Sequence, residues 1–159
     1  MKRFLAAAFI VLFLFTTSGC GSRGNGDLSL VGGEYRAQWE DDYRYDTPIL
    51  IDSYQEWLEF LETHPDQSTN EDVLEQDYSQ DFFADHIIYA YIKSEASGSN
   101  TLTVKGAARK DNILELTMER YVPDQGTDDL AARICVFGLK REDLKGIQEV
   151  KVSIIGKDS

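Results

Sequence analysis

The segment from His86 to Ile92 constrains the fold more than any other part of the sequence. It reads HIIYAYI, so apolar side chains occupy both sets of alternating positions. Because successive side chains of a β-strand point to opposite faces, such a strand is stable only when both faces are covered. The sequence therefore predicts a central strand at this place, buried between two layers of the protein.

The segments around this strand predict further strands. Alternating apolar residues indicate strands at 34–40, 48–51, 102–108, 114–118, 131–139 and 150–154. In the third of these, the even-numbered positions from Leu102 to Ala108 are expected to share one half-buried face. Turn residues at 97–100 and at 110–112 separate consecutive strands, which is typical of antiparallel hairpins.

One helix is predicted after the second strand. Ser53 and Glu56 have the spacing of a capping box, in which hydroxyl and carboxylate satisfy backbone N–H groups of the first turn. Apolar residues follow at helical spacing, at Tyr54, Trp57, Leu58 and Leu61. Pro65 marks the end of the helix. We therefore expect one α+β domain over 34–159, an antiparallel sheet of five to seven strands with one substantial amphipathic helix.

The first residues have the anatomy of a secretory leader. Lys2 and Arg3 give a positive start, and the apolar run at 4–15 is shorter than the roughly 20 residues that span a bilayer. The run ends in Thr17-Ser18-Gly19-Cys20, which resembles the lipobox of bacterial lipoproteins, although Thr17 stands where leucine is usual. In that motif a peptidase cuts before the cysteine, and its sulfur receives a diacylglyceryl group. A protein that is secreted without a lipid, or whose leader is not cleaved, is the alternative.

The lipobox resemblance implies a lipid-anchored protein on the extracytoplasmic side of the cell membrane. Residues 1–19 would be the signal peptide, and Cys20 would carry the lipid. Residues 20–33 are rich in Gly, Ser and Asn, which predicts a flexible tether between the anchor and the domain.

Charge narrows the choice of partners. The chain has a net charge of −12, and loss of Lys2 and Arg3 with the leader makes it −14. Such a surface repels nucleic acid and anionic lipid, so no nucleic-acid partner is expected. A solvated acidic face is one interpretation, and a basic partner or a divalent cation is the other.

Cysteine and histidine offer little chemistry. If Cys20 carries lipid, Cys135 is the remaining cysteine, so the chain cannot form an internal disulfide. Cys135 stands in an apolar strand segment, which predicts a buried thiol rather than a nucleophile. We expect His64 and His86 to be solvated or hydrogen bonded rather than metal ligands, and we expect no cofactor.

Two surfaces are candidates for interaction. Trp39, Tyr43 and Tyr45 crowd one acidic segment, and exposed aromatic residues among polar groups are typical of binding surfaces. The alternative is that Tyr35, Ala37 and Trp39 pack one strand face into the core. Both interpretations remain open at this stage.

The second candidate surface is the loop at 121–129. Asp124, Asp128 and Asp129 supply oxygen atoms that calcium prefers, but their spacing is not that of an EF-hand loop, and turn-forming aspartates are the alternative. Nearby, Arg133 interrupts an apolar strand. We expect it to pair with an acid such as Glu119 or to point from an outer sheet face.

Several segments resemble, in order, the PrcB C-terminal-like family and its small lipoprotein relatives. They are the helix at 53–61, Phe82-Phe83 before the apolar strand, the Ser97-Gly98-Ser99 turn, the Pro123 to Gly126 loop and the strand at 131–139. The resemblance covers roughly 48–155. It departs at Gly98-Ser99-Asn100, where that family tends to read Gly-Gly-Tyr. The family is named after a lipoprotein accessory subunit of a bacterial surface protease complex, so the resemblance implies an interaction role without catalytic residues.

The sequence leaves three functions open. The first is a membrane-anchored binding or accessory module, without catalysis, for another envelope protein. The second is an envelope hydrolase that uses carboxylates the sequence does not identify, since no G-x-S-x-G motif is present. The third is a lipoprotein that binds a small ligand or calcium.

Overall fold

The computed structural model describes residues 25–67 and 78–158. The leader, Cys20 and the first part of the expected tether lie outside these residues. The elements in chain order are β1 (Gly26–Leu28), β2 (Leu30–Gln38), β3 (Ile49–Ile51), α1 (Tyr54–Thr63), η1 (Phe82–Ala84), β4 (His86–Glu95), β5 (Thr101–Lys110), β6 (Ile113–Val122), β7 (Ala131–Lys140), η2 (Arg141–Leu144) and β8 (Glu149–Asp158). η1 and η2 are short 3₁₀ helices. None of the helices in this described part is long and apolar enough to cross a membrane.

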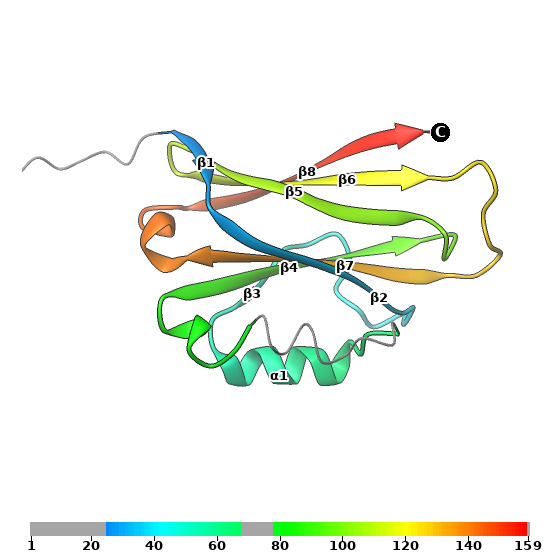
Figure 1. Ribbon diagram of the computed structural model, residues 1–159, viewed down its shortest axis with the longest axis horizontal. Helices are drawn as coiled ribbons and strands as arrows, with labels where there is room; N and C mark the ends of the chain where they lie inside the picture. The colour runs from blue at the N-terminus through cyan, green and yellow to red at the C-terminus, as the bar shows by residue number, and fades with distance from the viewer. Residues whose placement is uncertain (1–24, 68–77, 159) are drawn as a thin grey trace, which may run out of the picture.

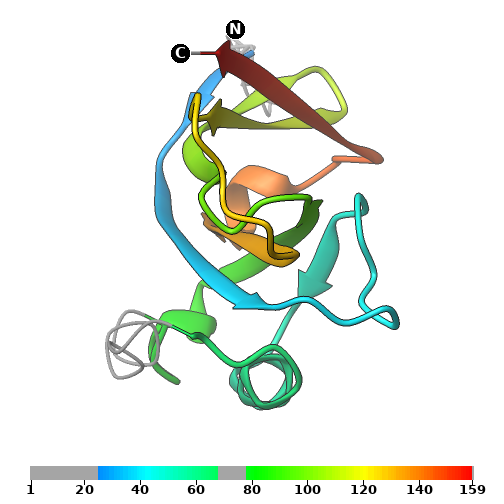
Figure 2. The ribbon, with the colours of Figure 1, turned by 90° about the vertical axis from the view of Figure 1, so that its right-hand side faces the viewer.

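The strands form two sheets of four. Sheet I has the order β1-β5-β6-β8, and sheet II has the order β2-β7-β4-β3. Figures 1 and 2 show the two sheets stacked, with α1 below sheet II. The expectation of a single antiparallel sheet of five to seven strands is therefore wrong. The chain crosses between the sheets four times, from β1 to β2, from β4 to β5, from β6 to β7 and from β7 to β8. β8 runs parallel to β6.

The prediction for the central apolar strand is confirmed. β4 lies inside sheet II, between β7 and β3. Its residues Ile88, Ala90 and Ile92 face the core on the side of α1, where Trp57 is fully buried. Tyr91 belongs to the other core, between the two sheets, together with Leu102, Ala107, Leu114, Leu116, Met118, Cys135, Phe137 and Leu139. Each face of β4 is thus covered by a separate hydrophobic layer.

Helix α1 begins as predicted. The Ser53 hydroxyl accepts a hydrogen bond from the Glu56 N–H at 3.2 Å, while the Glu56 carboxylate accepts the N–H of Asp52 at 2.7 Å rather than that of Ser53. The helix ends at Thr63, before Pro65. Its buried residues are Trp57 and Phe60, and Phe60 was absent from the predicted apolar face.

The predicted face of β5 is correct only in its first half. The pairing of β5 with β6 shifts register between Val104 and Gly106, because Lys105 forms a β-bulge. Leu102 is buried before the bulge, whereas Ala107 and Arg109 are buried after it. The inserted residue reverses which positions point inward, so the even-numbered pattern ends at Val104.

The last residues of the expected tether, 26–33, belong to strands in the structure apart from the residue between β1 and β2. Gly26–Leu28 pairs with β5, and the segment from Leu30 onward pairs with β7. A Cβ atom on Gly32 would lie 2.9 Å from side-chain atoms of Leu30 and Val104, so glycine allows the chain to pass close to β5. Backbone hydrogen bonds therefore order a segment whose composition predicts flexibility.

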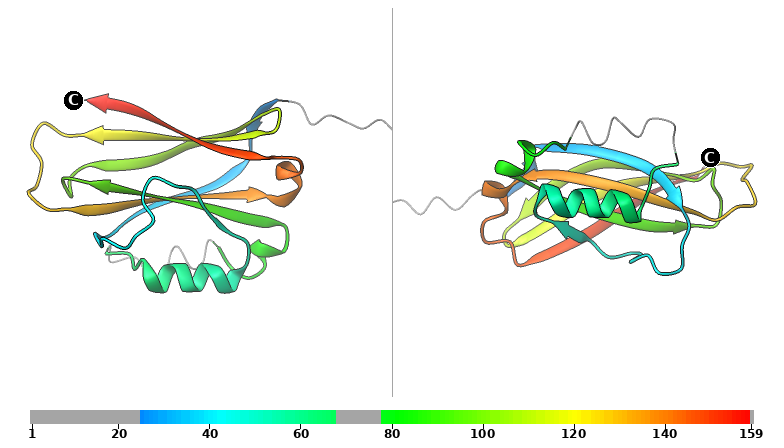
Figure 3. Two further views of the ribbon diagram at one scale, coloured as in Figure 1. Left: turned by 180° about the vertical axis from the view of Figure 1, so that it is seen from behind. Right: turned by 90° about the horizontal axis from the view of Figure 1, so that it is seen from below.

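The two ends of this sandwich carry different segments. Asn25 accepts a hydrogen bond from the Asp111 N–H at 2.6 Å, so the described chain begins beside the turn between β5 and β6. Eight residue steps of about 3.3 Å carry β2 roughly 25 Å from this N-terminal end to Gln38. The opposite end, which we call the loop end, holds the segments at 39–48, 96–100 and 121–130. Figures 1 and 3 show β1 and the 121–130 loop at opposite ends.

Candidate functional site

The segment that follows β2 is fixed against sheet II. Trp39 donates a hydrogen bond from Nε1 to Ser94 Oγ at 2.9 Å, and Tyr45 forms a parallel bridge with Ile92. Asp46 donates its N–H to the Ile92 carbonyl at 2.9 Å and accepts a bond from the Tyr91 hydroxyl at 2.9 Å. These contacts hold the aromatic segment in one conformation at the loop end.

Five rings from this segment and α1 form a continuous row, which we call the aromatic row. The centroid distances are 6.3 Å for Trp39–Tyr45, 6.0 Å for Tyr45–Tyr43, 4.4 Å for Tyr43–His64 and 4.2 Å for His64–Phe60. Phe60 is buried, whereas the other four side chains are half-buried. The row therefore runs from the core to the surface. Tyr35 and Ala37 pack into the core as the alternative interpretation expected, but Trp39 lies beyond the end of β2.

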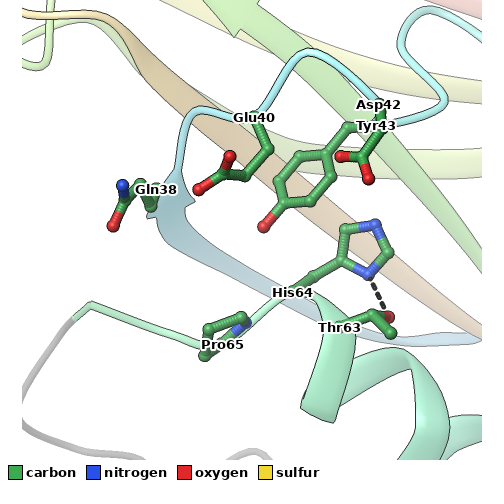
Figure 4. A pocket seen from close by; sticks show the side chains of 7 residues that line it. All are labelled: Gln38, Glu40, Asp42, Tyr43, Thr63, His64 and Pro65. Carbon is green, nitrogen blue, oxygen red and sulfur yellow. Dashed lines mark hydrogen bonds between the residues drawn. The ribbon is translucent and has the colours of Figure 1, made fainter.

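An open pocket of about 550 Å³ lies beside the row, and we call it the aromatic pocket. It is lined by Gln38, Glu40, Asp42, Tyr43, Thr63, His64 and Pro65. Figure 4 shows the Tyr43 ring between Glu40 on one side and Asp42 and His64 on the other. Its hydroxyl points into the space between Glu40 and Pro65. The pocket thus combines ring surfaces from two segments with two carboxylates.

The pocket is negative at neutral pH. Burial lowers the pKa of His64, although a hydrogen bond to the Phe60 carbonyl and the charge of Asp42 oppose this effect. His64 is therefore neutral at pH 7, and its Nδ1 lies 2.9 Å from the Phe60 carbonyl oxygen. Among the described residues that line the pocket, Glu40 and Asp42 carry charge and none is Lys or Arg. Burial, followed by the charges of Glu40, Tyr45 and Asp42, raises the pKa of Tyr43.

The three loop aspartates have separate environments. Asp129 pairs with Arg36 at 2.5 Å and accepts the Gly98 N–H at 3.0 Å. Hydrogen bonds from Thr127, from the Gly98 N–H and from Arg36 lower its pKa. Asp124 and Asp128 are exposed. The described part of the chain contains no group of three or more His, Cys, Asp or Glu residues that could hold a metal ion.

Asp129 instead helps to join two loops. Ser97 Oγ accepts the Thr127 N–H at 2.8 Å, next to the bond between Gly98 and Asp129. Arg133 donates to the Gly98 carbonyl at 2.5 Å, whereas Glu119, its expected partner, pairs with Lys105 at 3.3 Å. These hydrogen bonds join the turn at 97–99 to the loop at 127–129, beside β2. We call this pair of joined loops the latch.

Cys135 and His86 lie away from the pocket. Cys135 is fully buried, which confirms the predicted burial of this thiol, and burial raises its pKa. His86 begins β4 at the N-terminal end, where its ring stacks on Phe82. Of the two histidines, His64 alone joins the candidate site, and sequence reasoning missed it because its ring partner Tyr43 comes from another segment.

Comparison of the chain with protein-family models, with curated proteins and with solved structures finds no match.

Proposed function

We propose that the protein is a lipid-anchored envelope lipoprotein that acts as a non-catalytic binding module for another envelope protein. The observation that carries this proposal is the position of the aromatic pocket. It lies at the loop end, whereas the described chain begins at the opposite end beside Asp111. A site in this position faces a partner rather than the membrane that holds the anchor.

The distances are consistent with presentation away from the membrane. In this proposal Cys20 carries the lipid, and five peptide steps link it to Asn25. At no more than about 3.6 Å per step, the N-terminal end stands within about 18 Å of the lipidated residue. The loop end lies about 25 Å from the N-terminal end, along β2, and so stands up to that much farther from the anchor. The aromatic pocket is therefore accessible to proteins that occupy the same space.

The chemistry of the loop end favours binding. Tyrosine and tryptophan are enriched in protein interfaces because they provide a large apolar area with a polar tip. Trp39, Tyr43 and Tyr45 are half-buried. Contacts of Trp39 and Tyr45 with β4 already order this segment, so little entropy is lost when a partner binds. The resemblance to the PrcB C-terminal-like family favours the same role.

Crosslinking in cells tests the proposal. Formaldehyde treatment and purification of the full chain in detergent should recover one stable envelope partner. Cys20→Ser should move the chain from the membrane to the soluble fraction and reduce recovery of that partner. The proposal is contradicted if the wild-type chain yields no reproducible partner, or if Cys20→Ser leaves it in the membrane fraction.

A hydrolase is the second candidate, because Glu40 and Asp42 line the same pocket. Paired carboxylates can serve as general acid and base when their separation fits the substrate. Turnover of peptide or glycan substrates by the full chain, abolished by Glu40→Gln, would replace the binding proposal with this one.

A further inference from the structure

We infer that the aromatic pocket binds the guanidinium group of an arginine side chain presented by the partner protein. This inference rests on the proposed function and specifies the chemistry of the partner. It combines three features of the pocket: ring surfaces, unbalanced negative charge and a preordered wall.

The ring surfaces suit a planar cation. Tyr43 and His64 lie 4.4 Å apart between ring centroids, and Phe60 supports His64 from the core at 4.2 Å. Tyr43 is half-buried, so part of its ring remains open to the pocket. A guanidinium group stacks on aromatic faces, and the ring quadrupole attracts its positive charge.

The charge of the pocket favours a cationic ligand. Glu40 and Asp42 give the described lining a formal charge of −2, because His64 is neutral at pH 7 and no Lys or Arg is present. Carboxylates accept charge-assisted hydrogen bonds from the N–H groups of arginine. Figure 4 shows both carboxylates beside the Tyr43 ring, so the negative charge lies next to the ring surface.

The wall of the pocket is ordered before any ligand arrives. The Tyr45 hydroxyl donates to the Glu40 carbonyl at 2.8 Å, and Trp39 is fixed to Ser94. These bonds fix the backbone at Glu40 and the ring of Trp39. Preorganisation of this kind raises affinity because ordering costs are met during folding.

Nuclear magnetic resonance titration of the full chain in detergent tests the inference. The probe is N-acetyl-arginine methylamide, and the matched probe is its citrulline analogue, which has nearly the same shape and no charge. We expect saturable shifts of the Tyr43 and His64 resonances with the arginine probe and not with the citrulline probe. The lysine analogue should bind more weakly, because its ammonium group does not stack as a plane.

Single substitutions identify the contacts. Tyr43→Leu should weaken binding of the arginine probe about threefold through loss of the ring. Glu40→Gln should weaken it about threefold through loss of one charge near the surface. Asp27→Asn, an equal change of charge in β1 at the N-terminal end, should leave the affinity unchanged.

The outcomes separate this inference from the proposed function. The inference is overturned if the arginine probe causes no saturable shift at Tyr43 and His64, if citrulline binds equally well, or if lysine binds as tightly as arginine. A partner recovered in cells alongside any of these results leaves the binding module standing with a different ligand chemistry. Failure to recover any partner by crosslinking contradicts the proposed function as a binding module.

Discussion

Arg120 binds Glu95 through two parallel hydrogen bonds and so joins the two sheets. Its Nε donates to Glu95 Oε1 at 2.7 Å, and a terminal nitrogen donates to Oε2 at 2.6 Å. Glu95 ends β4 in sheet II, and Arg120 lies in β6 of sheet I. Asn100 donates a third bond to the same carboxylate at 2.7 Å, and Glu95 is 1% exposed. This ion pair fixes the loop end, where the aromatic pocket lies.

Removal of the arginine should be costly. Arg120→Met leaves a buried carboxylate without its charged partner, so we expect the free energy of unfolding to fall by about 3 kcal/mol. This value is at the lower end for buried pairs, because 32% of the Arg120 side chain is exposed. Urea denaturation measures the change. Lys105→Met, which breaks an exposed pair with Glu119, should cost at most about 0.5 kcal/mol. Equal losses in the two variants would contradict the role of the Glu95 pair.

The same pair predicts a dependence of stability on pH. Burial alone would raise the pKa of Glu95, but hydrogen bonds from Arg120 and Asn100 and the charges of Arg120 and Lys93 hold it below the usual value. Because the folded pKa is the lower one, the unfolded state binds the proton first as pH falls. The stability due to the pair is complete above the unfolded pKa, about 4.3, and is lost as pH falls through the folded pKa.

Glu95→Gln should therefore differ most from the wild type near neutral pH. We expect the difference in unfolding free energy to stay constant from about pH 7 to about pH 5 and to shrink below about pH 4. Urea titrations at a series of pH values measure this difference. A difference that stays constant down to pH 2, or grows there, would show that the folded pKa is not lowered.

Gly98 should be essential for the latch between the two loops. A Cβ atom there would overlap the Asp129 carboxylate and would lie 2.8 Å from a terminal nitrogen of Arg36. Gly98→Ala should break the Arg36–Asp129 pair, cost about 1–2 kcal/mol and speed hydrogen exchange over 121–130. Gly106→Ala is the control, because no atom lies within 4 Å of its added Cβ. Unchanged exchange in the Gly98 variant would show that the latch does not depend on this close approach.

Local patterns predicted the parts of the fold that depend on neighbouring residues. The two apolar faces of β4, the capping serine of α1 and the turn at 110–112 are short-range features, and the structure contains all three. The division into two sheets depends on where the chain crosses between layers. The bulge at Lys105 depends on pairing with β6. Neither feature leaves a clear local pattern, so a single sheet and an unbroken alternation were predicted.

The sequence predicted part of the candidate site. The cluster of Trp39, Tyr43 and Tyr45 in an acidic segment indicated a binding surface, and all three belong to the aromatic row. His64 comes from the end of α1, and only the tertiary fold places it against Tyr43. The Glu95–Arg120 pair was missed for the same reason, because residues 25 positions apart meet across two sheets.

Position-specific photocrosslinking in cells tests the central claim most directly. A photoreactive amino acid is placed at Asp41, which is exposed in the aromatic segment, or at Lys145, which is exposed after η2 at the N-terminal end. The account predicts a discrete adduct with one envelope protein from Asp41 in the membrane-anchored chain. It also predicts no such adduct from Lys145, and weaker crosslinking from Asp41 when Tyr43→Leu is added. An adduct from Lys145 without one from Asp41 would contradict the claim that the loop end binds the partner.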